Sequence, residues 1–572
     1  MYVRYFMWNF VGRQSDVQEA RWEDGLIFNT DSKNKGNNHY YFLPLLLGLM
    51  GLIWHIAADR KNAFVIGMLF FFTGVAIIMY LNQRPSQPRE RDYSYAGSFQ
   101  TFAIWVGLGI IFLVDVLWKY LGQRATVLTA VGLSLIVPTI MAVQNWDDHT
   151  RKGRYIDIEF AKNLLNSCEE NAILFTGGDN DTFPLWYIQE VEGYRTDVRL
   201  ANLELLISDW YIDQMKQPKN AAQPLPISME KEDYAGERDL IIQNYPSRKI
   251  SLPVDKDQLL ADGVISEAEY PFVGDPMVWE FKARGSKSNP YILRKDSVII
   301  DILRNVANDG WQRPVYFANT MAPSNFLNLN DYLRMEGMAY RVLPVKRTEE
   351  TINDIYYGRI AQDILQKNLT EKFLYTNLDN PSVNFDEHIR SVIVSNYRNS
   401  FFRLCNSYSE EIMKNQIVVG TFQQLSDGPM MTDSLELELI RMQEEITSDQ
   451  NEIRKLVNFM DQFIPSEVIP MPLTLSISFA QILQQAGIED LAEAAFERAT
   501  DQALAQLSRN VAAGVSNAQT QNSMAFRTIM ITIQSLAQQG KIEDAQSLAN
   551  RLEDITGNNM GTQLLQQIPQ EP

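Results

Sequence analysis

Four apolar runs dominate the first quarter of the chain and cover residues 40–57, 63–81, 101–121 and 125–143. Each run has roughly the ~20 residues that a helix needs to cross ~30 Å of hydrocarbon. Charged residues gather in the breaks between the runs, and none of the runs has the polar face of a surface helix. The pattern favours four membrane-spanning helices over four buried helices of a soluble core.

The patterns on either side of this block indicate several further domains. Residues 1–38 are aromatic and weakly basic, which suits a helix lying at a membrane interface. Residues after 147 alternate between strand and helix periodicity, and helical periodicity takes over after about 350. We therefore expect a multidomain protein: an interfacial segment (1–38), an α-helical membrane bundle of four spans (39–147), an α/β domain (148–347), a helical connecting region (348–465) and an all-α, tetratricopeptide-like region (466–572).

Strand and helix patterns alternate twice within the predicted α/β domain. The first unit is a helix over 156–165, a buried strand over 172–175, a helix from Phe183 to Val191 and a strand over 196–201. The second is a helix over 298–306 and a strand over 314–320, and we expect the strands at 172–175 and 314–320 to share one sheet. Residues 217–290 read as loops and short strands, and 332–345 reads as one closing strand.

Two glycines divide the C-terminal helical pattern. Helical spacing leads up to Gly487 and again to Gly540, and a helix rich in small residues follows each glycine. This arrangement resembles tetratricopeptide-like hairpins. The two glycines are 53 positions apart, not the ~34 of a regular array, so we expect hairpins without a regular repeat.

Charge and cysteine content exclude several classes of function. The 572 residues carry a net charge of −19, which argues against binding nucleic acid through a basic surface. The two cysteines, Cys168 and Cys405, form no CxxC motif, and the four histidines are scattered. This argues against a zinc site or a disulfide framework, while a single bridge between the two cysteines stays open.

The best candidate for chemistry is the stretch from Gly177 to Phe183, where a strand ends and a helix begins. Ligands bind at such positions in α/β sheets. Here Asp179, Asn180, Asp181 and Thr182 offer polar side chains, and Asp179 and Asp181 could ligate a divalent cation through oxygen. The alternative is an Asx-turn and helix cap, in which these side chains satisfy free backbone N–H groups.

The loop between the second and third runs is a second candidate. Arg84, Arg89, Arg91 and Tyr93 could bind the phosphate of a lipid-linked donor through charge-assisted hydrogen bonds. The alternative is that these arginines snorkel at a helix end and pair locally with neighbouring acids. Asp115, near the end of the third run, is either a functional group or the partner of Lys119 one helical turn away.

Several motifs resemble a known family along nearly the whole chain. They are Met1–Arg13 (MYVRYFMWNFVGR), Tyr40–Gly48 (YYFLPLLLG), Gln87–Gly97 (QPRERDYSYAG), Asn145–His149 (NWDDH) and Gly178–Tyr187 (GDNDTFPLWY). They resemble glycosyltransferase family 117, a membrane family formerly described as a domain of unknown function and similar to protein O-mannosyltransferases. No position matches the first extracytoplasmic loop, which carries the catalytic acid in such enzymes.

This resemblance implies the closing part of a glycosyltransferase membrane domain and its soluble domains, with the catalytic N-terminal half absent and the isolated chain inactive. It also implies a polyprenyl-phosphate sugar donor, a protein or glycan acceptor, an inner-membrane location and soluble domains in the periplasm. The arginine count of the loops favours the opposite topology, with the soluble domains in the cytoplasm. We expect the periplasmic topology that the family resemblance implies. The alternative function is a non-catalytic, membrane-anchored periplasmic scaffold that binds partners through its tetratricopeptide-like helices.

Overall fold

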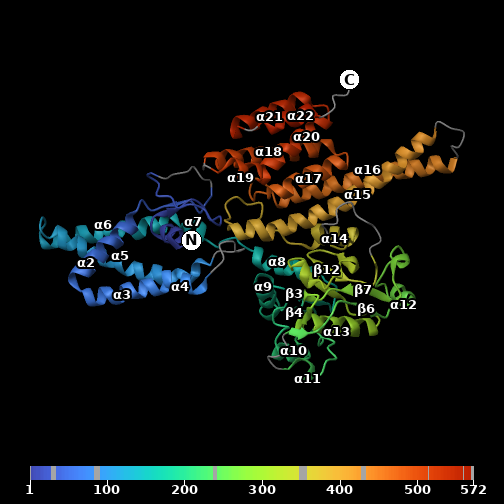
Figure 1. Cartoon of the computed structure of the whole chain (residues 1–572), viewed down its shortest axis with the longest axis horizontal. Coiled ribbons are helices and arrows are strands. Elements are labelled where there is room, and N and C mark those ends of the chain that lie inside the picture. Colours follow the sequence, from blue (N-terminus) through green and yellow to red (C-terminus); the bar gives the residue numbers. More distant parts are fainter. Residues whose placement is uncertain are drawn as a thin grey trace. The chain divides into compact units, whose positions relative to one another are not determined.

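The computed structural model describes residues 2–27, 34–82, 91–235, 241–346, 357–426, 433–512, 515–557 and 559–567. The chain forms two compact units, one of Met1–Arg154 with Pro381–Arg390 and one of Tyr155–Asn380 with Ser391–Pro572. The first unit holds the apolar helices, and the second holds the large sheet and the C-terminal helices (Figure 1). A short segment from far along the chain therefore completes the first unit.

The first unit is a helical bundle that follows a short helix and a two-stranded antiparallel sheet. Its elements are α1 (Tyr2–Phe10), β1 (Gly12–Arg13), β2 (Asn38–His39), α2 (Leu43–Ala58), α3 (Arg60–Thr73), α4 (Val75–Leu81), α5 (Ala96–Leu117), α6 (Gln123–Gln144) and α7 (Trp146–His149).

Three stretches of this unit are long and apolar enough to cross a membrane: Arg60–Leu81, Tyr93–Leu117 and Gln123–Gln144. They correspond to three of the four predicted runs. The first run instead forms α2, whose 16 residues extend ~24 Å, which is less than the ~30 Å of a bilayer core. A fourth span therefore stays a prediction.

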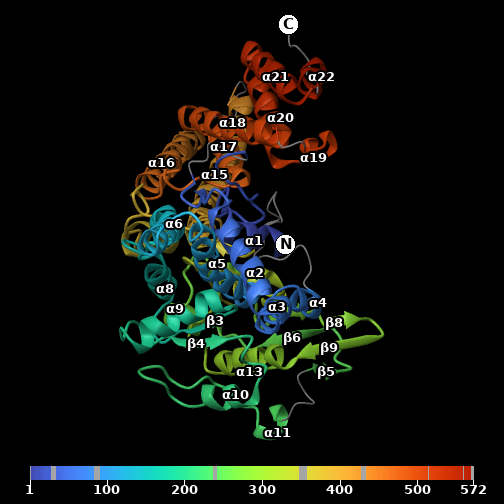
Figure 2. The ribbon, with the colours of Figure 1, turned by 90° about the vertical axis from the view of Figure 1, so that its left-hand side faces the viewer.

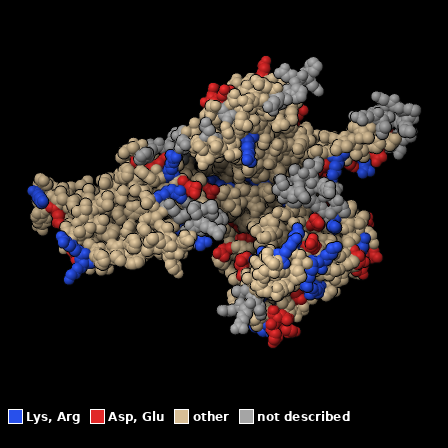
Figure 3. Space-filling model, in the orientation of Figure 1, with Lys and Arg blue, Asp and Glu red and all other residues tan. Residues whose placement is uncertain are grey.

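The outer surface of the bundle is apolar. Phe64 and Leu128 are 68% and 73% exposed, and many other large apolar side chains of α2 to α6 also face outward. On the face of the bundle seen in Figure 3, charged side chains gather near the ends of the helices. Such a surface is unfavourable in water and fits the hydrocarbon of a bilayer.

Close backbone contact holds α2 against α5. A Cβ atom on Gly51 would lie 1.8 Å from the carbonyl oxygen of Trp105, and one on Gly109 would lie 2.3 Å from the carbonyl oxygen of Leu47. Only glycine fits at these two positions. In lipid no hydrophobic effect drives helices together, so apolar helices associate by van der Waals packing. Small residues at a crossing allow the close backbone contact that this packing needs.

Aromatic side chains fasten α1 to this bundle. The ring centroids of Phe6 and Phe10 lie 4.9 and 4.6 Å from that of Phe102 on α5. The Tyr2 hydroxyl donates to Ser98 Oγ at 3.0 Å. The N-terminal helix is thus part of the packed unit, and its position at a membrane interface stays a prediction.

The second unit contains a six-stranded sheet in the order β13-β11-β12-β10-β3-β4. Its strands are β3 (Ile173–Thr176), β4 (Arg199–Asn202), β10 (Val315–Ala318), β11 (Leu333–Met335), β12 (Ala339–Val342) and β13 (Arg359–Ile360). Strands β10, β3 and β4 are parallel, and β12 is antiparallel to β10. The prediction that the strands near 173 and 315 share a sheet is confirmed, since Tyr316 lies opposite Leu174.

The helices of the α/β region are α8 (Ile156–Asn166), α9 (Asp179–Glu190), α10 (Asp209–Met215) and α13 (Arg294–Asn308). Two sequence predictions need correction here. Helix α9 begins at Asp179, four residues before Phe183, so Pro184 lies inside it. Residues 332–345 form two antiparallel strands, β11 and β12, and not one closing strand. The chain turns at Gly337, which lies so close to Ser167 that a Cβ on Gly337 would be 2.3 Å from Ser167 Oγ.

The excursion between these halves forms small sheets and short helices, in line with the sequence. Its elements are α11 (Lys231–Tyr234), β5 (Ile241–Gln243), β6 (Arg248–Leu252), α12 (Lys256–Ala261), β7 (Met277–Phe281), β8 (Arg284–Ser286) and β9 (Asn289–Leu293). Strands β8 and β9 form a hairpin, which is seen clearly in Figure 2.

The rest of the second unit is helical. It comprises α14 (Gln362–Lys367), α15 (Val394–Ser426), α16 (Asp433–Phe463), α17 (Leu473–Gln485), α18 (Glu489–Ala512), α19 (Asn517–Gln521), α20 (Met524–Gln538), α21 (Ile542–Thr556) and α22 (Met560–Gln567). Gly487 and Gly540 have positive φ angles of 71° and 75° and end α17 and α20 as helix breaks. Whether these hairpins belong to a tetratricopeptide-like class stays a prediction.

The cysteines are not bridged. Cys168 and Cys405 are both free and buried, which corrects the open alternative of a disulfide. Burial raises the pKa of both thiols above the ordinary value, to about 12 for Cys405. Two protonated, inaccessible thiols act as small apolar groups of the core.

Candidate functional site

The predicted polar stretch lies at the carboxyl edge of the parallel strands. Thr176 ends β3, Asn202 ends β4 and Thr320 follows β10, and these three parallel strands are neighbours in the sheet. Because parallel strands end at the same edge, the three side chains converge above it. Helix α9 starts at this edge and adds Asp181 and Thr182 from its first turns.

Hydrogen bonds link these side chains into one buried cluster. Thr320 Oγ1 donates to Asp181 Oδ2 at 2.8 Å. Asn202 Nδ2 donates to Thr182 Oγ1 at 2.9 Å and to the Gly177 carbonyl at 3.2 Å. The hydroxyls of Thr176 and Thr182 are also 2.9 Å apart. The structure thus gives Asp181 and Thr182 partners from strands that the sequence could not assign to them.

Asp181 has an unusual setting for a carboxyl group. It is 5% exposed, and burial raises its pKa above the ordinary value, with nearby Asp179 acting in the same direction. The Thr320 hydrogen bond opposes this rise by stabilising the carboxylate. A buried carboxyl group with a raised pKa at the edge of a sheet can hold a proton where an exposed aspartate would have lost it.

The two other predicted side chains lie outside this cluster. Asp179 and Asn180 are exposed, whereas Asp181 is buried. Residues two apart on a helix do not face each other, so α9 directs the two carboxylates differently. Among the described residues, no group of three or more histidine, cysteine, aspartate or glutamate side chains could hold a metal ion. A divalent cation at Asp179 and Asp181 stays a prediction.

The predicted phosphate-binding loop belongs to the first unit. Arg84 and Arg89 lie outside the described residues. Arg91 is exposed at the start of the turn that leads into α5, and Tyr93 is 62% exposed. Both residues are therefore accessible beside the end of a candidate span.

Asp115 has a different partner from the predicted one. The indole Nε1 of Trp54 on α2 donates to Asp115 Oδ2 at 2.7 Å. This contact crosses from α2 to α5 and corrects the expected pairing with Lys119. The tertiary contact prevails because α2 packs directly on α5.

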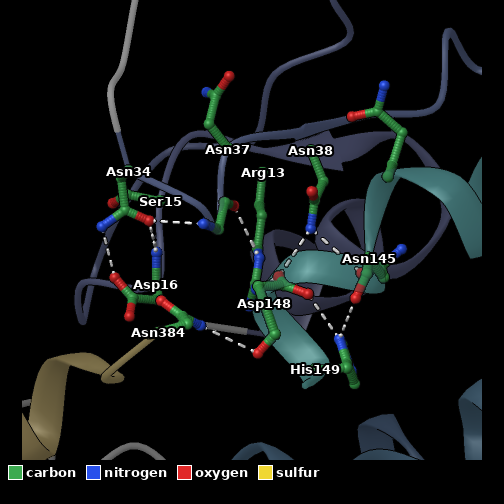
Figure 4. Close-up of polar contacts among 12 residues, drawn as sticks. Arg13, Ser15, Asp16, Asn34, Asn37, Asn38, Asn145, Asp148, His149 and Asn384 are labelled. Atoms are coloured by element: carbon green, nitrogen blue, oxygen red, sulfur yellow. Dashed lines mark hydrogen bonds and ion pairs between the residues drawn. The ribbon is translucent and has the colours of Figure 1, made fainter. Parts of the chain in front are cut away.

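A second polar cluster, in the first unit, was not predicted as a site (Figure 4). Asp148 forms an ion pair with Arg13, and Asn38 Nδ2 donates to Asp148 Oδ2 at 3.0 Å and to Asn145 Oδ1 at 3.1 Å. Asn384 Nδ2 reaches the Asp148 carbonyl at 3.2 Å. The motif at 145–149 supplies Asn145 and Asp148 to this cluster. Their partners Arg13, Asn38 and Asn384 are more than a hundred positions away in the sequence.

The remaining contacts of this cluster fasten the late segment 381–390 to the first unit. Arg390 Nη2 lies 2.7 Å from Asp16 Oδ1, and Arg154 Nη2 lies 2.8 Å from Asp386 Oδ2. Lys35 Nζ also donates to the Ser382 carbonyl at 3.1 Å. These paired charges explain the late segment's place in the unit, so we assign the cluster a structural role.

The α/β region resembles one protein family. Residues 157–245 and 241–364 match the family model of TMEM260-associated domain 2. The chain is also 31% identical over 183 residues to the mouse protein named "Protein O-mannosyl-transferase TMEM260". That alignment covers 28% of this chain and 25% of the mouse protein. No solved structure matches the chain.

These matches support a TMEM260-like family for the region that contains both the sheet and the Asp181 cluster. Together with the three candidate spans, they support membrane association.

Proposed function

We propose that this chain forms part of an integral-membrane glycosyltransferase of family 117 type, which uses a polyprenyl-phosphate sugar donor. In this proposal the soluble domains recognise the protein or glycan acceptor and lie in the periplasm beside the inner membrane. The observation that carries the proposal is the 31% identity to a protein named as an O-mannosyl-transferase, in a chain that also has three candidate spans.

The donor phosphate is assigned to Arg84, Arg89, Arg91 and Tyr93. The accessible positions of Arg91 and Tyr93 beside the start of α5 support this role. A guanidinium group at this level can bind a lipid phosphate through two charge-assisted hydrogen bonds. No catalytic residue is assigned.

The test is a mass-spectrometric profile of glycosylated envelope proteins in cells that lack the gene. We expect specific glycan masses to disappear and to return when the intact gene is restored. An Arg91→Ala gene should restore less than a tenth of the glycan. An Arg124→Ala gene should restore it fully, because Arg124 lies at the start of α6, next to the end of α5 away from Arg91. An unchanged profile without the gene would overturn the proposal.

A non-catalytic periplasmic scaffold is the second candidate. The helical hairpins at Gly487 and Gly540 favour it, since stacked hairpins of this kind often present surfaces to partner proteins. A scaffold predicts an unchanged glycan profile in cells that lack the gene, together with loss of a membrane assembly that restoring the gene recovers.

A further inference from the structure

A pocket of about 280 Å³ lies along the outer edge of the sheet, away from the Asp181 cluster. Its lining comes from the second half of α9, from the edge strand β4 and from α10 with the loop after it. None of Thr176, Asp181, Thr182 or Asn202 lines it. The volume is close to the lower end of the range for small-molecule sites, which is enough for one ring-sized ligand.

Aromatic side chains form much of its wall. Trp186 on α9 and Trp210 on α10 both line the pocket, and Trp210 is 56% exposed. Tyr211 lines it as well, with its ring centroid 5.6 Å from that of Trp210. The face of an indole carries negative charge, so it attracts the polarised C–H groups on the face of a pyranose ring.

Polar side chains surround this aromatic wall. Lys219 Nζ pairs with Glu190 Oε1 at 2.8 Å, and Asn220 Nδ2 lies 3.4 Å from the same oxygen. All three side chains line the pocket. An ammonium group, a carboxylate and an amide together offer both donors and acceptors, which is what the hydroxyl groups of a sugar require.

A buried arginine adds positive charge to the pocket. Arg199 lines it, is 2% exposed, and donates from Nη2 to the carbonyls of Gln214 and Gln217 at 2.9 and 3.0 Å. Its Nε and Nη1 have no acceptor, and no carboxylate of the described residues contributes to its pKa, which burial lowers. A guanidinium buried without a counter-ion carries an uncompensated desolvation cost, which a nearby anion would reduce.

We propose that this pocket binds a hexopyranose ring that carries a carboxylate or phosphate group. The ring packs on Trp186 and Trp210, its hydroxyls meet Glu190, Lys219 and Asn220, and its anionic group lies on the Arg199 side. Binding here does not depend on sugar transfer by the membrane unit, so the two proposals fail independently.

The experiment is calorimetric titration of the full chain in lipid nanodiscs free of sugar detergents. The probes are glucuronate, glucose 6-phosphate, methyl glucoside and inorganic phosphate. We expect saturable binding of both anionic sugars, at least fivefold weaker binding of methyl glucoside, and no saturable binding of inorganic phosphate. Comparing the anionic sugars with methyl glucoside measures the contribution of the anionic group. Comparing them with inorganic phosphate measures the contribution of the sugar ring.

Trp210→Ala is the decisive variant, because a half-exposed side chain can be removed without loss of the fold. We expect it to weaken glucuronate binding at least tenfold. Tyr187→Ala is the matched control, since Tyr187 is 46% exposed on the same helix as Trp186 and lies outside the pocket, and it should change affinity less than twofold.

Three results would overturn the proposal. The first is that no sugar binds, and the second is that glucuronate binding is unchanged in Trp210→Ala. The third is that inorganic phosphate binds as tightly as the anionic sugars, which would make the site one for a free anion. Equal affinity for methyl glucoside and glucuronate would also overturn it, because the anionic group would then contribute nothing.

Discussion

The arginines near the two edges of the large sheet differ in whether carboxylates pair with them. On the β11–β13 side, Arg334, Arg341 and Arg359 occupy three adjacent strands, with Arg334 opposite both of the others. Carboxylates neutralise them: Arg334 lies 2.9 Å from Glu269 Oε1, Arg359 lies 2.8 Å from the same oxygen, and Arg341 pairs with Glu169. On the β4 side, Arg199 has only backbone carbonyls.

This difference separates a structural cluster from a candidate binding surface. Glu336, 1% exposed, accepts from Arg334 Nε at 2.8 Å and from the Tyr316 hydroxyl at 2.6 Å, so the charges on that side are compensated within the fold. The Arg199 charge is not compensated by any acid of the described residues. Burial, and after it the nearby charge of Arg199, lower the pKa of Arg313 to about 10. Uncompensated positive charge therefore lies at the β4 side of the sheet.

The largest effect is expected from Arg334→Met. The change leaves the buried Glu336 with only a 3.8 Å contact to Arg341, and it leaves Glu269 with Arg359 alone. Breaking a buried ion pair in this way costs about 3–5 kcal/mol in comparable proteins. We expect the urea midpoint of the full chain, followed by tryptophan fluorescence, to fall accordingly. A loss below about 1 kcal/mol would mean that this cluster does not stabilise the fold.

Glu269→Gln should have an intermediate effect that depends on pH. Burial raises the pKa of Glu269, but Arg334 and Arg359 outweigh it and hold the pKa at about 2, below the ordinary 4.5. The carboxylate therefore stabilises the fold above about pH 4.5, and this contribution is lost as the pH falls towards 2. Allowing for partial solvent screening, we expect a cost of about 1–2 kcal/mol at pH 7. A cost that is the same at pH 7 and at pH 3 would contradict the assignment.

Arg199→Met should have a small effect, in contrast with Arg334→Met. Methionine replaces an uncompensated buried charge with an apolar side chain, so the lost carbonyl hydrogen bonds are offset by the removed desolvation cost, and we expect a net change within about 1 kcal/mol. Thermal unfolding without ligand measures it. A loss as large as that of Arg334→Met would show that Arg199 is a structural residue.

Asp181→Asn should have the smallest effect and the opposite pH dependence to that of Glu269. The folded pKa of Asp181 is raised by burial, so the unfolded chain releases this proton at lower pH and the fold loses stability as pH rises from about 3.8 through the raised pKa. Asparagine removes that dependence while it still accepts from Thr320. Melting temperatures measured from pH 4 to pH 8 should therefore favour the variant increasingly towards neutral pH. A constant difference would show that Asp181 titrates normally.

Local patterns predicted the elements of this fold better than its long-range contacts. Apolar length identified the three candidate spans, and alternation identified β3, β4 and β10. The start of α9 was misplaced because Pro184 favours the first turn of a helix, whereas Gly178 already starts the helix six residues earlier. The β11–β12 turn depends on the contact between Gly337 and Ser167, which no local pattern reveals.

The same limit applies to the sites. The stretch at 177–183 could be located from its position after a strand, but the burial of Asp181 depends on the sheet order that brings Thr320 beside it. Arg199 appeared in the sequence only as one residue of a strand. That this strand is an edge strand, and that no carboxylate of the described residues pairs with Arg199, follows only from the three-dimensional fold.

Hydrogen exchange of the full chain with and without glucuronate tests most directly whether the β4 side is a binding surface. We expect slower exchange of backbone amides in α9, β4, α10 and the loop through Ala222, at least threefold, with no change in β11 to β13. Unchanged exchange around the pocket, or protection confined to the β11–β13 side, would contradict the division of the sheet into a self-neutralised side and a ligand-binding side.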